Sequence, residues 1–262
     1  MAEKLSKTNA SVEKTLKLIE ILAASAEPQR LSDLAAAADM PVATTLRMVN
    51  TLVQCGYAYQ ETRGAQRYGL TMRFLQIGQM TLEHMSIRDV ARPYLMELAE
   101  ATGETCCLAM EDRGVVRYLD VLDHSRNSLQ ARQRVGGTAA MYATSSGKAL
   151  LSRHTPEQMD AYFRDHPLLP LTGYTINQPD SLLRELAEVR ATGVAYDREE
   201  CEIGMRCMAA PIVNGSHVIA AICLSGPVSR LTTERVETDL LPRLRRCADQ
   251  VTGQVCGVKH ED

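Results

Sequence analysis

The sequence lacks the features that mark membrane and secreted proteins. It has no run of about 18 apolar residues, so we expect no transmembrane helix. Its first residues, MAEKLSKTNASVEK, are polar and lack the apolar core of a secretion signal, which predicts a cytoplasmic protein. Repeats and low-complexity tracts are also missing, apart from the short alanine run at residues 35–38.

The cysteines lack the spacing of metal ligands. There are eight of them, yet none forms a CxxC pair and no histidine stands at ligand spacing from two of them. Cytoplasmic thiols stay reduced, and a free cysteine behaves as a small apolar side chain. We therefore expect core cysteines and neither metal nor cofactor, with a redox sensor at the adjacent Cys106 and Cys107 as an alternative.

The bulk composition allows one or two domains. The chain has 262 residues, and hydrophobic residues make up 45% of them, which is enough for packed cores. Residues 1–75 hold nine Lys/Arg against seven Asp/Glu, a net charge of +2, whereas the remainder holds 20 against 25, a net charge of −5. This mild asymmetry permits a nucleic-acid contact through the N-terminal part.

The N-terminal part predicts three helices followed by a hairpin. Ser11 is placed to cap the first helix, Glu27-Pro28-Gln29 ends it, and Ser32 is placed to cap the second. Asp39-Met40-Pro41 forms the turn, since Asp tolerates a left-handed backbone and Pro suits the start of a helix. The third helix has its apolar inner side at Leu46, Val49, Leu52 and Val53, and two short strands with a Gly-bearing loop follow within residues 57–70. This order is typical of a winged helix-turn-helix, in which the hairpin is the wing.

The rest of the chain reads as two connecting helices and then an α+β domain. Residues 71–102 have a helical pattern that Gly103 closes, and from Glu104 onward strands and helices alternate. Residues 105–110 and 115–121 are predicted paired strands, and residues 208–213 and 217–225 form a hairpin around Asn214-Gly215. We expect a DNA-binding domain at 1–72, a linker helix at 73–90 and a second domain at 91–262.

The helix after Pro41 is the predicted DNA-reading element. Small side chains in the preceding alanine-rich helix let the two helices pack closely. The first residues of the helix after Pro41 are then free to reach base edges in the major groove. Threonine bonds phosphates or bases, and Arg47 suits phosphate or guanine. The alternatives are an ion pair between Arg47 and Asp39, and a domain that binds only protein. The candidate DNA-binding residues are Ser32, Val42, Ala43, Thr44, Thr45, Arg47 and Met48, with Arg63 and Arg67 in the wing.

Several motifs in the same order give the chain a resemblance to the IclR family of bacterial transcription regulators. They are Tyr68-Gly-Leu, Ala101-Thr-Gly-Glu-Thr, Ala143-Thr-Ser-Ser-Gly-Lys-Ala-Leu-Leu, Gly193-Val-Ala-Tyr-Asp-Arg-Glu-Glu, Gly204-Met-Arg-Cys-Met-Ala-Ala-Pro-Ile and Leu224-Ser-Gly-Pro. The resemblance implies a GAF-like effector-binding domain with a central antiparallel sheet, and homodimers or homotetramers on palindromic double-stranded DNA operators. The chain departs from the family at Val42 and Ala43, where two basic or hydroxyl-bearing residues are common. Recognition of the operator sequence should therefore depend more on Thr44, Thr45, Arg47 and the wing.

The resemblance also implies a pocket for a small-molecule carboxylate effector, such as a sugar, organic or aromatic acid. Free backbone N–H groups and hydroxyls at the start of the helix near residue 145 would seat the carboxylate. Serine caps, a solvated acidic turn at 197–200 that pairs with Arg198 or Arg206, and inert core cysteines remain as alternatives. The residues carried over by motif position are Tyr142, Ser145, Ser146, Asp197, Met205, Cys207, Cys223 and Ser225.

An enzyme is the main competing class. Ser145-Ser-Gly-Lys148 matches the S-x-x-K pattern of acyl transfer, although the accompanying S-D-N and K-T-G motifs are absent. Cys207 is a candidate thiol nucleophile without a histidine nearby in sequence. We expect a regulator, more specifically a repressor, rather than an acyl-transfer or thiol enzyme.

Overall fold

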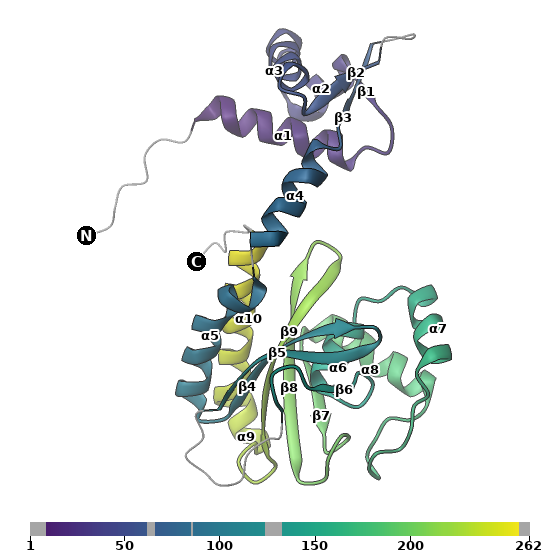
Figure 1. Ribbon diagram of the computed structural model, residues 1–262, viewed down its shortest axis with the longest axis vertical. Helices are drawn as coiled ribbons and strands as arrows, with labels where there is room; N and C mark the ends of the chain where they lie inside the picture. Colours follow the sequence, from purple (N-terminus) through teal and green to yellow (C-terminus); the bar gives the residue numbers. More distant parts are fainter. Residues whose placement is uncertain (1–8, 62–65, 85, 124–132, 257–262) are drawn as a thin grey trace, which may run out of the picture. The chain divides into compact units, whose positions relative to one another are not determined.

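A computed structural model describes residues 9–61, 66–84, 86–123 and 133–256. The chain divides into two compact units, Met1–Met85 and Ser86–Asp262. Figure 1 shows both units, and each is described by itself. Within the described residues, no helix is long and apolar enough to cross a membrane.

The first unit is a winged helix-turn-helix. Its helices are α1 (Ala10–Ala24), α2 (Leu31–Ala38), α3 (Val42–Gln54) and α4 (Arg73–His84), and its strands are β1 (Gln29–Arg30), β2 (Ala58–Gln60) and β3 (Arg67–Leu70). The predicted hairpin β2–β3 is confirmed, and β1 adds a third antiparallel strand that the sequence did not predict. Leu18, Leu34 and Val49 are fully buried in the common core of α1, α2 and α3. Asp39 ends α2 in the left-handed conformation expected of the turn.

Two predicted helix caps are wrong. Asn9, and not Ser11, caps α1 by accepting the Ser11 N–H. The second cap fails because α2 begins one residue earlier than expected, at Leu31. Ser32 therefore lies in the first turn, where its hydroxyl bonds Asp33 rather than the backbone.

The second unit is built on one six-stranded antiparallel sheet in the order β6-β5-β4-β9-β8-β7. Its helices are α5 (Ile87–Thr102), α6 (Ser145–Leu151), α7 (Pro156–Asp165), α8 (Pro179–Thr192), α9 (Thr233–Arg235) and α10 (Leu241–Cys256), with a π-helical stretch at Val236–Leu240. Its strands are β4 (Thr105–Asp112), β5 (Val115–Asp123), β6 (Thr138–Ala140), β7 (Ala195–Arg198), β8 (Met205–Asn214) and β9 (His217–Pro227). Both predicted strand pairs, β4–β5 and β8–β9, are confirmed.

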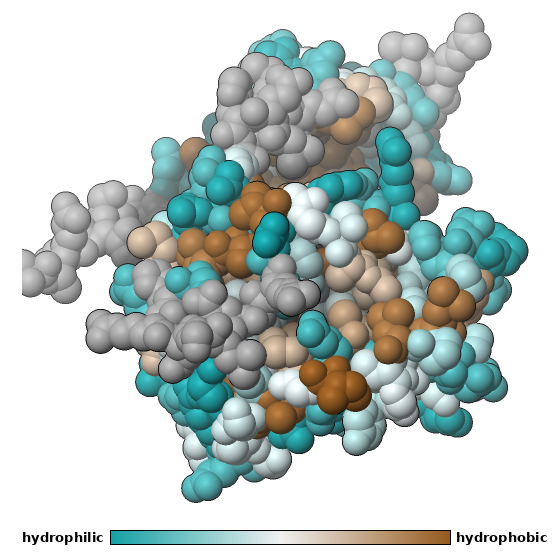
Figure 2. All heavy atoms as spheres, turned by 60° about the horizontal axis from the view of Figure 1, so that its bottom comes forward, coloured by the Kyte–Doolittle hydropathy of each residue, from teal (hydrophilic) through white to brown (hydrophobic). Residues whose placement is uncertain are grey.

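Alternating residues of the strands feed two separate cores. On β8, Met208 and Ile212 face α5 and α10, whereas Cys207 and Ala209 face α6, α7 and α8. This alternation is the period of two that a strand imposes, and both faces are apolar because helices cover both. Figure 2 shows one face of the molecule, where apolar side chains lie in separate small groups among polar ones.

Local signals explain the ends of several helices. Thr155 and Gln158 form a capping box at the start of α7, with Pro156 at its first position. Gly103 and Gly193 close α5 and α8 in the left-handed conformation. The last helical region is irregular near Pro242, since the π-helical stretch ends two residues before this proline, which has no N–H for the usual helical bond.

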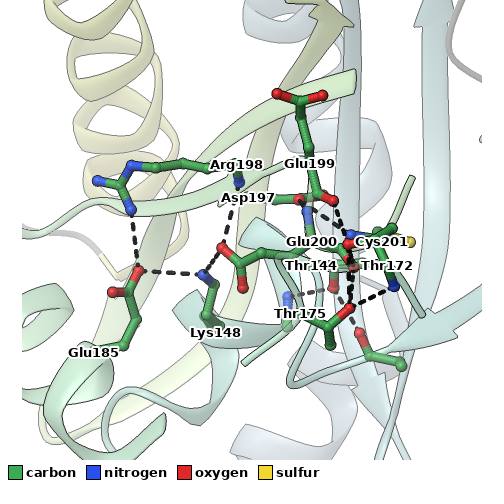
Figure 3. Close-up of polar contacts among 12 residues, drawn as sticks. Thr144, Lys148, Thr172, Thr175, Glu185, Asp197, Arg198, Glu199, Glu200 and Cys201 are labelled. Atoms are coloured by element: carbon green, nitrogen blue, oxygen red, sulfur yellow. Dashed lines mark hydrogen bonds and ion pairs between the residues drawn. The ribbon is translucent and has the colours of Figure 1, made fainter. Parts of the chain in front are cut away.

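A buried ion pair ties α6 to the turn after β7. Lys148 is 0% exposed, and its Nζ lies 2.7 Å from Glu200 Oε1 and 3.2 Å from Glu185 Oε1 of α8. Figure 3 shows Lys148 beneath Glu200, with Arg198 reaching Glu185 from above. Burial raises the pKa of Glu200 and Lys148 opposes that rise. A solvated acidic turn at 197–200 is therefore the wrong alternative.

Gly147 determines how closely α6 approaches the chain before it. A Cβ on Gly147 would lie 2.2 Å from the Cα and carbonyl oxygen of Met141, both backbone atoms. We predict that Gly147→Ala lowers the free energy of unfolding by about 3 kcal/mol through overpacking. The matched control is Gly173→Ala in the same unit, where an added Cβ meets nothing within 4 Å. Denaturant unfolding measures both, and equal stability of the two variants would contradict the assignment.

Lys148→Met leaves the buried carboxylate of Glu200 without its cation. Because breaking a buried pair from one side typically costs about 3–5 kcal/mol, we predict a loss of that order in the free energy of unfolding. Adding Glu200→Gln should restore part of the loss. Arg198→Met, at the 56%-exposed partner of Glu185, should cost less than about 1 kcal/mol. A Lys148→Met protein as stable as Arg198→Met would show that the pair does not hold these elements together.

Candidate functional site

The residues of α3 that face outward differ from the predicted ones, as if the helix were rotated about its axis. Thr45 and Met48, predicted to face outward, are buried, and Leu46, predicted to face inward, is 37% exposed. The Thr45 hydroxyl donates to the carbonyl of Pro41 at 3.2 Å, which satisfies it inside the core. The sequence pattern misassigned these positions because threonine was treated as a polar, outward residue, although a helical Thr bonds its own backbone.

Most of the predicted DNA-binding residues of α3 are nevertheless accessible at its surface. Val42, Ala43 and Arg47 are exposed and Thr44 is half-buried. Arg47 makes no ion pair within the described chain, so the alternative pairing with Asp39 is not observed. Further exposed residues of α3, not among the predicted DNA-binding residues, are Leu46, Asn50, Thr51 and Gln54.

The wing gives a mixed outcome. Arg67 is half-buried, and its Nη1 donates to the carbonyl of Pro28 at 3.1 Å, so it holds β3 against the segment before β1. Ser32, at the start of α2, is exposed. Arg63 lies outside the described residues.

A cavity of about 210 Å³ lies in the second unit between the start of α6 and the strands β5, β7, β8 and β9. Six of the eight predicted effector residues line it. They are Ser145, Ser146, Asp197, Met205, Cys207 and Cys223. The other two do not line it. Tyr142 is buried and its hydroxyl donates to the carbonyl of Leu169, and the buried Ser225 hydroxyl lies 3.3 Å from Cys223 Sγ.

Sequence reasoning missed other lining residues, among them Tyr118, Gln133, Cys201 and Glu202. Gln133 donates to the Ser225 hydroxyl at 3.0 Å, across 92 positions of sequence. Nothing local in the sequence signals such a contact, because it depends on the order of the sheet, in which β4 lies between β5 and β9.

The start of α6 presents a buried hydroxyl to this cavity. Thr144, not Ser145 or Ser146, caps the helix by accepting the Gly147 N–H, so the alternative that the two serines are caps is wrong. Ser145 lies 3.5 Å from Cys223 Sγ. The Ser146 hydroxyl is buried with only the weakly bonding Cys223 thiol beside it, and Gln133 Oε1 has no hydrogen-bond partner within the described chain. Buried polar atoms are normally satisfied, so these two are available to a ligand.

Asp197 is the buried acidic group of the cavity, whereas Glu202, which also lines it, is exposed. Asp197 Oδ1 accepts the backbone N–H groups of Glu200 at 2.8 Å and Cys201 at 3.3 Å, which fixes the turn after β7. Burial raises its pKa to about 7, and the neighbouring Glu200 adds to the rise while the two N–H bonds oppose it. The carboxyl therefore changes charge near neutral pH.

The geometry does not support acyl transfer at Ser145 or thiol chemistry at Cys207. A hydrogen bond with Cys223 and burial raise the pKa of the Cys207 thiol well above its usual value, which disfavours the nucleophilic thiolate. Lys148 Nζ is held by Glu200 and Glu185 and does not line the cavity, so it does not serve Ser145 as a base. Burial raises the pKa of Cys106 and Cys107 well above the usual thiol value, which makes the redox pair unreactive. Within the part of the chain that the structure describes, no cluster of side chains suits a metal ion.

Comparison with known proteins gives the same picture over both units. Residues 11–62 match the IclR helix-turn-helix domain, and residues 79–253 match the bacterial transcriptional regulator IclR C-terminal domain. The DNA-binding transcriptional repressor YiaJ of Escherichia coli is 31% identical over 243 residues, which cover 92% of this chain and 86% of the relative.

Solved structures agree. A putative IclR transcriptional regulator from Silicibacter sp. TM1040 superposes with a TM-score of 0.74 at 28% identity, covering 97% of this chain and 98% of that one. An IclR homologue from Microbacterium hydrocarbonoxydans, crystallised with 4-hydroxybenzoate, gives a TM-score of 0.59 at 25% identity, covering 95% and 100%. Such relatives are regulators and not enzymes, and the chain belongs to the IclR family of DNA-binding transcriptional regulators.

Proposed function

We propose that the chain is a ligand-responsive transcriptional repressor. The observation that carries the proposal is the 210 Å³ cavity, whose lining combines two buried polar atoms without a nitrogen or oxygen partner, Ser146 Oγ and Gln133 Oε1, with an acid that titrates near neutrality. The similarity to a repressor supports the direction of regulation, and the 4-hydroxybenzoate complex of a relative supports a small carboxylate as the effector class.

Each lining group has a part in ligand binding. The Ser146 hydroxyl donates to the ligand carboxylate, Gln133 Oε1 accepts from a ligand hydroxyl, and protonated Asp197 donates a further hydrogen bond. Met205 and Cys207 supply the apolar wall against the ligand body. A hydroxylated or aromatic acid matches this combination.

The N-terminal unit binds DNA through α3 in the major groove. Arg47 neutralises a phosphate or contacts guanine, while Val42 and Ala43 meet thymine methyl groups. The chain forms homodimers or homotetramers, and in these the α3 helices of two chains contact the two halves of a palindromic operator. Effector binding shifts the population of the DNA-competent state through the helices that connect the units. A repressor of this kind acts in the cytoplasm, where the operator lies.

The cavity assignment predicts the effect of two substitutions. A panel of organic, sugar and aromatic acids is first screened by thermal shift, because a ligand that binds the folded state raises its melting temperature. For the acid that binds, Ser146→Ala should weaken affinity about tenfold through loss of a charge-assisted hydrogen bond. The matched control is Ser152→Ala, a buried serine of the same helix region whose hydroxyl bonds the carbonyl of Ala149 outside the cavity. Equal affinity of the two variants would exclude the assignment.

The same cavity predicts a pH dependence of effector binding. Below pH about 7 Asp197 is protonated and donates to the ligand carboxylate, whereas above it the ionised group repels that carboxylate. Affinity should therefore fall as pH rises through 7 in the native protein. Asp197→Asn, which is uncharged at every pH, should flatten the profile. Calorimetric titration from acid to mildly alkaline pH tests this, and an unchanged slope in Asp197→Asn would contradict the role of Asp197.

The α3 assignment predicts a change in the salt dependence of DNA binding. Arg47→Ala should lower affinity for duplex DNA and reduce the slope of log affinity against log salt by about one. Thr45→Ala should instead destabilise the domain, since Thr45 is buried and bonds Pro41. Fluorescence anisotropy across a salt series measures the slope, with Arg164→Ala, an exposed residue of the other unit, as the control. A slope in Arg47→Ala equal to that of the control would refute the contact.

A further inference from the structure

A second cavity lies across the strand pair β7–β8 from the effector cavity. It has a volume of about 340 Å³, and Asp197 and Cys207 line both cavities. Residues alternate between the two sides of the pair, as the strand period requires. Met205 lines the first cavity only, while Tyr196, Arg206 and Met208 line the second only. The two spaces thus share one wall of two strands.

Arg206 is the less exposed of the two arginines that line the second cavity. Its Nη1 donates to the carbonyl of Leu231 at 3.1 Å, but its Nε is buried and has no acceptor within the described chain. It also forms no ion pair with any described carboxylate. A buried guanidinium N–H without an acceptor is uncommon in folded proteins, and an anion in the adjoining space would satisfy it.

The strand register adds a second, independent indication of an anion. Arg198 on β7 stands directly opposite Arg206 on β8, and both line the cavity. Like charges at directly opposed positions repel each other. Arg198 is drawn partly aside, since its guanidinium lies 4.6 Å from the ring centroid of Tyr196 and 3.5 Å from Glu185. Glu185 pairs with Arg198 and not with Arg206. The two carboxylates that line the cavity, Asp197 and Glu237, form no ion pair with Arg206 among the described residues.

The remaining lining sets the shape of the ligand. Tyr196, Met208 and Val236 offer apolar surface, and Thr233 and Glu237 stand at the α9 end of the cavity. Glu237 is exposed and accepts hydrogen bonds from a donor at that end. An anion at Arg206, an apolar body and a hydroxyl toward Glu237 are therefore complementary to the cavity.

We propose that this second cavity binds a small hydroxy-carboxylate, with its carboxylate on Arg206 and its hydroxyl toward Thr233 and Glu237. The site is separate from the effector cavity and does not depend on the proposed effector. Because the two sites share the β7–β8 wall, occupation of one changes the position of Asp197 and Cys207 in the other. A metabolite of this class would then modulate the response to the primary effector.

Mandelate is a suitable probe, since it carries one carboxylate, one hydroxyl and an apolar ring. Calorimetric titration of the full-length protein should show saturable binding, and the neutral methyl ester of mandelate should not bind. Arg206→Gln should weaken mandelate binding at least about tenfold, and Arg206→Lys, which keeps the charge but loses the planar fork, should give an intermediate affinity. Arg164→Gln, an exposed arginine outside both cavities, should bind as the native protein does.

The same titrations separate this site from the effector cavity and from a merely structural arginine. If mandelate does not saturate the native protein by about 10 mM, the proposal is wrong. It is also wrong if Arg206→Gln binds as tightly as the native protein, or if Ser146→Ala alone abolishes binding, which would put mandelate in the effector cavity. Melting temperatures of the variants are measured alongside; if Arg206→Gln is unfolded, Arg206→Lys and Tyr196→Leu replace it, and undiminished binding in both overturns the proposal.

Discussion

The architecture of the second unit depends on the buried ion pair between Lys148 and Glu200. The pair joins α6, which supplies Ser145 and Ser146, to the turn that follows Asp197. A charge at 0% exposure is stable only with its partner in place, so the two walls of the cavity are held in one arrangement. The hydroxyls of Thr172 and Thr175 add bonds of 2.7 and 2.6 Å to the carbonyls of Glu199 and Glu200.

The sheet converts this local constraint into two distinct environments. Because alternate residues of β8 and β9 face opposite sides, the same strands complete the apolar core under α5 and α10 and line the cavity under α6. A displacement of β7 or β8 therefore shifts the side chains packed on both faces of the sheet, since a close-packed interior transmits strain. The unit thus has a physical route from a ligand in the cavity to α5, the helix that opens the unit at Ile87.

The helical and strand pattern was largely predictable, whereas the orientation of individual side chains was less so. Turn chemistry at Asp39 and at Asn214-Gly215 is local, and the structure confirms it. The error on α3 arose because a helix of 13 residues with apolar groups on more than one side allows two orientations, and only packing against α2 decides that Thr45 lies inside. Here the tertiary context determined the outcome.

For the cavity, the resemblance to a family supplied residues that physical reasoning from one sequence does not bring together. Ser146, Asp197 and Cys223 are far apart in the chain and converge only through the order of the strands. Gln133 and Tyr118 were missed for the same reason, and Lys148 gained its meaning only from the position of Glu200.

The central claim is that ligand binds between α6 and the β7–β8 strands, and hydrogen exchange tests it most directly. Mass spectrometry would compare exchange in the full-length protein with and without an acid that raises its melting temperature. We expect slowed exchange at residues 144–151 and 197–207, because the ligand bridges these two walls. Protection confined to other segments, with these two unchanged, would contradict the account.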